Sequence, residues 1–105
     1  MSGAYRLTPK AVDGFRRIAL YARDRFGSAV AERVVDELER AFARLADQPA
    51  IGHRREDLTA HAHVRFWSVG PTLVAYRRKP EWIEVLFVER ADIDWESLLK
   101  RQLEE

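Results

Sequence analysis

Hydrophobic side chains recur at spacings of three and four residues in two successive runs near the start of the chain. The first run consists of Val12, Phe15, Ala19, Ala22 and Phe26. The second run consists of Ala31, Val34, Val35, Leu38, Ala41, Phe42 and Leu45. Because this spacing aligns side chains along one side of an α-helix, each run predicts an amphipathic helix with one buried stripe.

The residues that flank the two runs predict where the helices begin and end. Thr8 is a good N-cap, and Pro9 is pre-organised for the first helical position. Gly27 is expected to end the first helix because glycine tolerates left-handed backbone geometry, and Ser28 is expected to cap the second helix. A connection this short predicts an antiparallel helical hairpin over residues 9–48.

The second half of the chain changes to patterns typical of β-strands. Helical periodicity fails in residues 50–63, which are predicted to form a loop. Segments rich in β-branched and aromatic residues follow at Val64–Val69, Leu73–Arg78 and Trp82–Val88. Their connections have the length of turns, which predicts antiparallel neighbours, and the short segment Tyr5–Leu7 is free to join an edge of the sheet.

Together these elements predict a single α+β domain that spans residues 1–105. The helical hairpin is expected to pack on one face of a small antiparallel β-sheet built from residues 5–7 and 64–88. A short C-terminal helix is predicted over residues 92–103.

The predicted C-terminal helix is amphipathic, and Asp92 or Asp94 could cap it. Its apolar side consists of Trp95, Leu98, Leu99 and Leu103. Docking of this side on the core of the domain is the simpler interpretation. A terminal amphipathic helix that a partner displaces is the alternative.

Charge and composition restrict the classes of function. The net charge of +1 argues against a general polyanion binder, although residues 54–90 are locally basic and the tail after Asp92 is acidic. The chain has no cysteine, which excludes disulfides. No signal peptide is expected in Met1–Arg6, and no stretch is long enough to cross a membrane, so we expect a cytoplasmic protein.

Candidate catalytic and metal-binding groups are few and scattered. They are His53, His61, His63, Glu81, Glu84 and Glu89. The histidines match no known spacing of zinc ligands, and nothing in the sequence separates the pKa values of two glutamates for acid–base catalysis. The sequence therefore predicts no catalytic residue, no metal site and no cofactor.

Arginines and aromatic residues are interleaved on the predicted strands. The set consists of Arg65, Trp67, Tyr76, Arg77, Arg78, Trp82 and Arg90. By strand alternation, Arg65 and Trp67 share one face, as do Tyr76 and Arg78. Such a surface could hold RNA by phosphate contact and base stacking, or it could hold a peptide. The alternative is that the aromatic rings fill the core and the arginines face solvent.

From Tyr5 to about Asp92, the sequence resembles the ParE/RelE superfamily of bacterial type II toxins, and the ParE branch in particular. The matching features are Tyr5-Arg6-Leu7-Thr8, Ile18, Tyr21, the hairpin to Leu45, Pro49-Ala50-Ile51-Gly52, Arg54–Leu58, Val74-Ala75-Tyr76-Arg77 and Ile83-Glu84-Val85. The resemblance implies a neighbouring antitoxin whose partly disordered segment folds across the toxin. RelE-like members cleave messenger RNA on the ribosome, whereas ParE-like members poison DNA gyrase.

The sequence departs from the ribonuclease pattern of RelE-like members. Leu73 and about Asp92 stand where arginines are expected, and Tyr76 lies in the middle of a strand. RNA cleavage requires a base for the 2′-hydroxyl, and no residue obviously supplies one. These departures favour the ParE branch. The acidic tail also differs from the more basic ends of that branch.

The resemblance thus predicts a non-enzymatic toxin that binds a ParD-like antitoxin and DNA gyrase. The residues predicted to contact the antitoxin or the target are Arg65, Trp67, Tyr76, Arg77, Arg78 and Trp95. One alternative is a ribosome-dependent ribonuclease whose site contains Arg65, Arg77 and Arg90. Another is a decayed toxin that retains only antitoxin binding.

Overall fold

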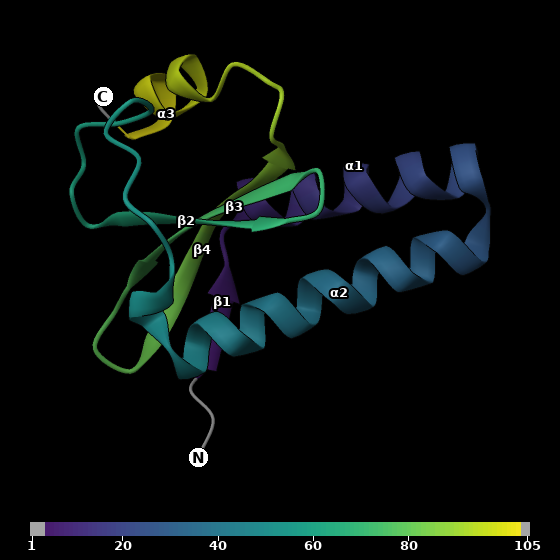
Figure 1. Ribbon diagram of the computed structural model, residues 1–105, viewed down its shortest axis with the longest axis horizontal. Coiled ribbons are helices and arrows are strands. Elements are labelled where there is room, and N and C mark those ends of the chain that lie inside the picture. Colours follow the sequence, from purple (N-terminus) through teal and green to yellow (C-terminus); the bar gives the residue numbers. More distant parts are fainter. Residues whose placement is uncertain (1–3, 104–105) are drawn as a thin grey trace.

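The computed structural model describes residues 4–103, and its elements follow the predicted order. They are β1 (Ala4–Leu7), α1 (Pro9–Phe26), α2 (Ser28–Asp47), the 3₁₀ turn η1 (Pro49–Ile51), β2 (Val64–Val69), β3 (Thr72–Arg78), β4 (Trp82–Arg90) and α3 (Trp95–Leu103). The predicted α+β class is confirmed (Figure 1). Residues 1–3 and 104–105 lie outside the described residues. The ends of the predicted domain, and most of the segment in which no signal peptide is expected, fall on them or beside them.

The sheet has the strand order β1-β4-β3-β2. The antiparallel pairing of β2 with β3 and of β3 with β4 is confirmed. β1 occupies the edge beside β4 and runs parallel to it, with Ala4 opposite Trp82 and Leu7 opposite Val85. The sheet is therefore mixed, and not wholly antiparallel as expected. No tight turn joins β1 to β4, so no turn geometry imposes an antiparallel direction on this pair.

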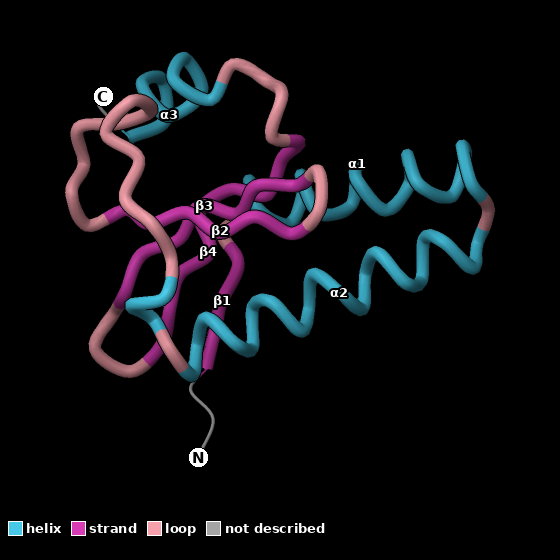
Figure 2. Tube along the Cα trace, in the orientation of Figure 1, coloured by secondary structure: helices cyan, strands magenta, loops and turns pink. Residues whose placement is uncertain are grey.

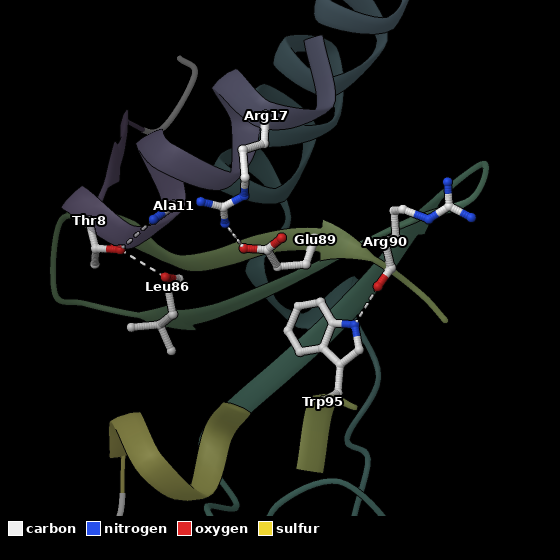
Figure 3. A network of polar contacts seen from close by, with 7 residues as sticks. All are labelled: Thr8, Ala11, Arg17, Leu86, Glu89, Arg90 and Trp95. Carbon is white, nitrogen blue, oxygen red and sulfur yellow. Dashed lines mark hydrogen bonds and ion pairs between the residues drawn. The ribbon is translucent and has the colours of Figure 1, made fainter. Parts of the chain in front are cut away.

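Beyond Val85, the edge of β4 is covered by the start of α1 and not by a strand. The Thr8 backbone N–H donates to the Val85 carbonyl oxygen at 3.0 Å, and the Thr8 hydroxyl donates to the Leu86 carbonyl oxygen at 2.8 Å. The same hydroxyl accepts a hydrogen bond from the Ala11 N–H at 3.1 Å, so the predicted cap is confirmed (Figure 3). Thr8 thus ends β1, begins α1 and fastens both to β4.

Gly14 allows α1 to continue along this edge at very short range. A Cβ atom at Gly14 would lie 2.0 Å from the carbonyl oxygen of Val88 and 2.9 Å from a carboxylate oxygen of Glu89. Backbone atoms of β4 cannot move aside without disturbing the sheet. A residue without a side chain is therefore required where the helix crosses β4.

The sheet has a core on each face. On the hairpin side, α1 and α2 cover a buried cluster that includes Leu38, Phe42, Leu45, Val74 and Val85. On the other side, α3 (Figure 2) contributes Trp95 and Leu99 to a second cluster that also includes Phe66, Leu73 and Phe87. The C-terminal helix therefore docks on the core, as the simpler interpretation of its apolar side expects, and buries Trp95 and Leu99 there.

Tyr76 connects the sheet to the loop that follows α2. Its ring is fully buried on the hairpin side, and its hydroxyl donates to the Pro49 carbonyl oxygen at 2.7 Å. The same hydroxyl accepts from the Gly52 N–H at 2.9 Å. Burial raises the pKa of Tyr76, so the phenol stays neutral and keeps both hydrogen bonds at neutral pH.

Some details at the helix ends differ from the predictions. Ser28 is the first residue of α2 and makes no capping bond, because Gly27 with φ of 93° already serves as the N-cap. Val12 and Phe26, which were expected in a buried stripe, are 38% and 64% exposed. The far half of the hairpin extends past the end of the sheet (Figure 1), which accounts for the exposure of Phe26, the last residue of α1.

The C-terminal helix begins later than expected, at Trp95 and not at Asp92. Of the two predicted caps, Asp94 takes the role by accepting from the Ser97 N–H at 3.1 Å. Asp92 instead pairs with Arg90, in the connection between β4 and α3. Within residues 4–103, none of the helices combines the length and apolar character needed to span a bilayer.

The close contact at Gly14 predicts an unusual response to substitution. In an exposed helix interior, Gly→Ala stabilises by roughly 1 kcal/mol through helix propensity. Gly14→Ala should instead destabilise the protein by about 1–3 kcal/mol, because the new methyl group collides with the Val88 carbonyl. Urea unfolding checks the sign of the change in unfolding free energy. Ala43→Gly, at an exposed position of α2, is the control, because it measures the effect of helix propensity alone. An unchanged or higher midpoint for Gly14→Ala would refute the close approach.

The hydroxyl of Tyr76 should be necessary for stability. Tyr76→Phe leaves the Gly52 N–H and the Pro49 carbonyl without their buried partner, which should cost about 1–3 kcal/mol. Tyr21→Phe, at a position that is 43% exposed, serves as the control and should change little. Equal unfolding free energies for the two variants would contradict the proposed anchoring of the loop.

Candidate functional site

An open groove of about 470 Å³ lies between the helical hairpin and the end of the sheet. We call it the hairpin groove. Its apolar lining consists of Ile18, Tyr21, Ala22, Phe26, Val30, Val34, Leu38, Val69, Pro71 and Ile93. α1 and α2 contribute most of these side chains, and the end of β2, the β2–β3 turn and the connection after β4 contribute the rest.

The hairpin groove exposes large apolar side chains to solvent. Tyr21 is 43% exposed, Phe26 is 64% exposed and Ile93 is 39% exposed. Part of the hairpin has no sheet to cover it (Figure 1), and the apolar lining residues Phe26 and Val30 lie on either side of the turn between the two helices. Contiguous exposed apolar surface of this kind marks an interaction site.

Charged side chains stand at the rim of the groove beside Tyr21. Arg17 forms an ion pair with Glu89 (Figure 3). The guanidinium of Arg90 lies 5.5 Å from the centre of the Tyr21 ring, and that of Arg25 lies 5.2 Å from the same ring. Tyr21 is therefore flanked by two cations whose charge is accessible at the groove.

Arg90 is held by Asp92 in a bidentate pair. Its Nε donates to one carboxylate oxygen at 3.0 Å, and its Nη2 donates to the other at 2.9 Å. This hydrogen bonding raises the pKa of Arg90 and lowers the pKa of Asp92. The backbone carbonyl of Arg90 accepts the indole N–H of Trp95 at 2.8 Å, so the same residue also positions the start of α3 (Figure 3).

Two of the six residues predicted to contact a partner are inside the protein. Tyr76 is 0% exposed, and its hydroxyl is fully used by the loop after α2. Trp95 is 2% exposed and packs edge-to-face on Phe66 with ring centres 6.0 Å apart. In this conformation neither side chain is accessible to a partner, because each one completes a core.

Trp67 and Arg65 lie together on the hairpin side of β2. The Trp67 ring is half-buried, stacks on His53 at 6.1 Å and lies 5.5 Å from the guanidinium of Arg44. Arg65 donates to the Gly52 carbonyl oxygen at 2.9 Å. Neither residue lines the hairpin groove.

Arg77 and Arg78 occupy the end of β3 far from the groove. Arg77 is half-buried and pairs with Glu84 at 2.7 Å, while Arg78 is exposed. In the β2–β3 register, Arg65 stands opposite Tyr76 and therefore on the face opposite to Arg77. Because Arg90 lies at the other end of β4, the arginines of the ribonuclease alternative do not converge among the described residues.

Sequence reasoning missed the groove because it assigned both helical stripes to the core. One signal was present. Helices of 18 and 20 residues span roughly 27 and 30 Å, whereas the strands predicted at Val64–Val69, Leu73–Arg78 and Trp82–Val88 span only roughly 20–23 Å. A hairpin longer than its sheet leaves part of its apolar stripe without cover.

The comparisons with known proteins agree with this fold. The chain resembles a solved structure titled "Chromosomal ParDE TA system from P. aeruginosa", with a TM-score of 0.71 and 20% identity over 86% of this chain and 97% of that one. No curated protein sequence matches the chain. The sequence pattern described as "ParE toxin of type II toxin-antitoxin system, parDE" matches residues 5–95, so the chain belongs to the ParE toxin family.

Proposed function

We propose that this protein is the toxin of a ParDE-type pair, that a ParD-like antitoxin neutralises it by occupying the hairpin groove, and that its target is DNA gyrase. The observation that carries the proposal is the open apolar groove on a chain of the ParE family. The toxin acts by binding and not by catalysis. It works in the cytoplasm, where gyrase and the antitoxin are found.

The shape and chemistry of the groove support a protein segment as its occupant. Tyr21 and Phe26 are the kind of large side chains that anchor protein interfaces, and Ile93 supplies an aliphatic wall. An amphipathic segment that folds on binding can fill such a groove with residues from one face. Covering this surface removes exposed apolar area from water, which favours association.

The arrangement of the sheet supports a non-enzymatic toxin over a ribonuclease. Arg65 and Arg77 lie on opposite faces, and each already has a hydrogen-bond partner within the protein. The hydroxyl of Tyr76 donates and accepts in the core, so it is not available as a general base. Among the described residues, these groups do not assemble a site for RNA cleavage.

Surfaces outside the groove are proposed for the target. The Trp67 ring between His53 and Arg44 presents aromatic and cationic groups together, and Arg78 is exposed at the other end of the sheet. Both features remain accessible when the groove is filled. Trp67 and Arg78 are therefore our candidates for contacts with gyrase, with Arg77 held close by through Glu84.

A matched pair of substitutions tests the position of the antitoxin. Ile93→Ala removes an apolar contact in the groove and should weaken antitoxin binding roughly fivefold. This loss corresponds to the free energy gained when a partly exposed aliphatic side chain is buried in the complex. Val12→Ala is the control, because Val12 is 38% exposed against 39% for Ile93 but lies outside the groove. Titration calorimetry with the cognate antitoxin measures both. Equal affinities for the two variants would place the antitoxin elsewhere.

Induced expression without antitoxin tests the target. Thymidine incorporation should fall before methionine incorporation, because a gyrase poison stops replication first. Trp67→Ala should delay the arrest if this ring contacts gyrase, provided that its unfolding midpoint is unchanged. Early loss of methionine incorporation would support the ribonuclease alternative instead. Unchanged growth with soluble, antitoxin-binding protein would identify a decayed toxin.

A further inference from the structure

The charged side chains at the rim of the hairpin groove are only partly paired within the protein. The guanidinium groups of Arg25 and Arg90 lie against the Tyr21 ring, and Arg17 lines the same groove. Glu89 compensates Arg17 and Asp92 compensates Arg90. Arg25 contacts the Tyr21 ring but forms no ion pair with a described residue. Glu37 also lines the groove, so the groove as a whole carries charges of both signs, while two of the cations, Arg25 and Arg90, lie against Tyr21.

The pair between Arg90 and Asp92 is exposed and local. The side chains are 48% and 67% exposed, and the two residues are separated by one position in the chain. An exposed pair of this kind contributes little to the stability of a fold. The backbone carbonyl of Arg90, and not its side chain, holds Trp95, so the guanidinium can change partner without releasing α3.

We infer that Arg90 is a specificity-determining contact for an acidic amphipathic partner segment, and that Asp92 is an internal competitor that holds Arg90 until a carboxylate of the partner replaces it. This inference rests on the proposed antitoxin contact at the groove. The exchange keeps the charge of Arg90 compensated in both states. Apolar residues of the segment fill the groove, and its carboxylate meets the rim beside Tyr21.

The exchange has a chemical consequence for partner choice. A bidentate carboxylate can satisfy the guanidinium fork as Asp92 does, whereas a neutral amide gives a weaker contact. A partner without an acidic residue at this point would leave Asp92 in place and gain only the apolar contacts. A basic residue there would face Arg25 and Arg90 and be rejected.

The chain contains a matched control for the competitor. Arg55 and Asp57 form the same bidentate pair across one intervening residue, with both contacts at 2.9 Å. Neither residue lines the hairpin groove. Asp57→Asn and Asp92→Asn thus remove the same type of exposed pair, but only the second lies at the proposed contact.

The test uses the full chain and two synthetic peptides. Both peptides are amphipathic helices with the same leucine face, and one carries glutamate where the other carries glutamine. Fluorescence anisotropy measures the affinity of each peptide for the parent protein and for Asp92→Asn, Asp57→Asn and Arg90→Gln. Thermal unfolding of every variant shows whether the fold is retained.

The glutamate peptide should bind the parent protein more tightly than the glutamine peptide. Asp92→Asn should tighten the glutamate peptide by about twofold to fivefold, as expected for release of an exposed ion pair, while Asp57→Asn should leave it unchanged. Arg90→Gln should weaken the glutamate peptide and spare the glutamine peptide.

Equal binding of the two peptides, no binding of either, or equal effects of Asp92→Asn and Asp57→Asn would overturn the inference. The toxin assignment is judged separately, by the order in which thymidine and methionine incorporation fail. If Asp92→Asn lowers the unfolding midpoint, Asp92→Ser is used in its place, and the same tightening of the glutamate peptide is expected.

Discussion

The contact between α1 and the open edge of β4 determines the rest of this structure. β1 ends at Leu7, and Thr8 ties the start of α1 to the Val85 and Leu86 carbonyls. Gly14 then lets the helix pass the Val88 carbonyl at a distance that no side chain would permit. This contact fixes the direction of the hairpin, whose far half extends past the end of the sheet (Figure 1). The hairpin groove lies where the hairpin leaves the sheet.

Local patterns predicted the elements well because the forces that define them are local. The Thr8 cap, the helical stripes and the turn-linked strands can be recognised from neighbouring residues. Contacts between distant residues were not predictable in this way. The parallel β1–β4 pair and the approach of Gly14 to Val88 depend on how the elements meet. The candidate site was missed because a stripe at helical spacing does not reveal whether anything covers it.

The polar residues of the strands and the hairpin groove differ in how far they are satisfied within the protein. Arg65 and Arg77 form hydrogen bonds within the protein, to the Gly52 carbonyl and to Glu84, and Tyr76 serves the loop after α2. The hairpin groove instead leaves large apolar side chains exposed, with Arg25 and Arg90 beside Tyr21. A scaffold that satisfies its own strand chemistry and exposes a groove is suited to binding another protein, in agreement with its membership of the ParE family.

Hydrogen exchange of the free toxin and of its antitoxin complex tests the central claim most directly. The account predicts slower exchange in the complex at the far half of the hairpin, residues 21–34, and in the connection around Ile93. It predicts little change at the end of the sheet that carries Arg77 and Arg78. Protection confined to that end of the sheet, with the hairpin unaffected, would contradict the claim that the groove is the binding site.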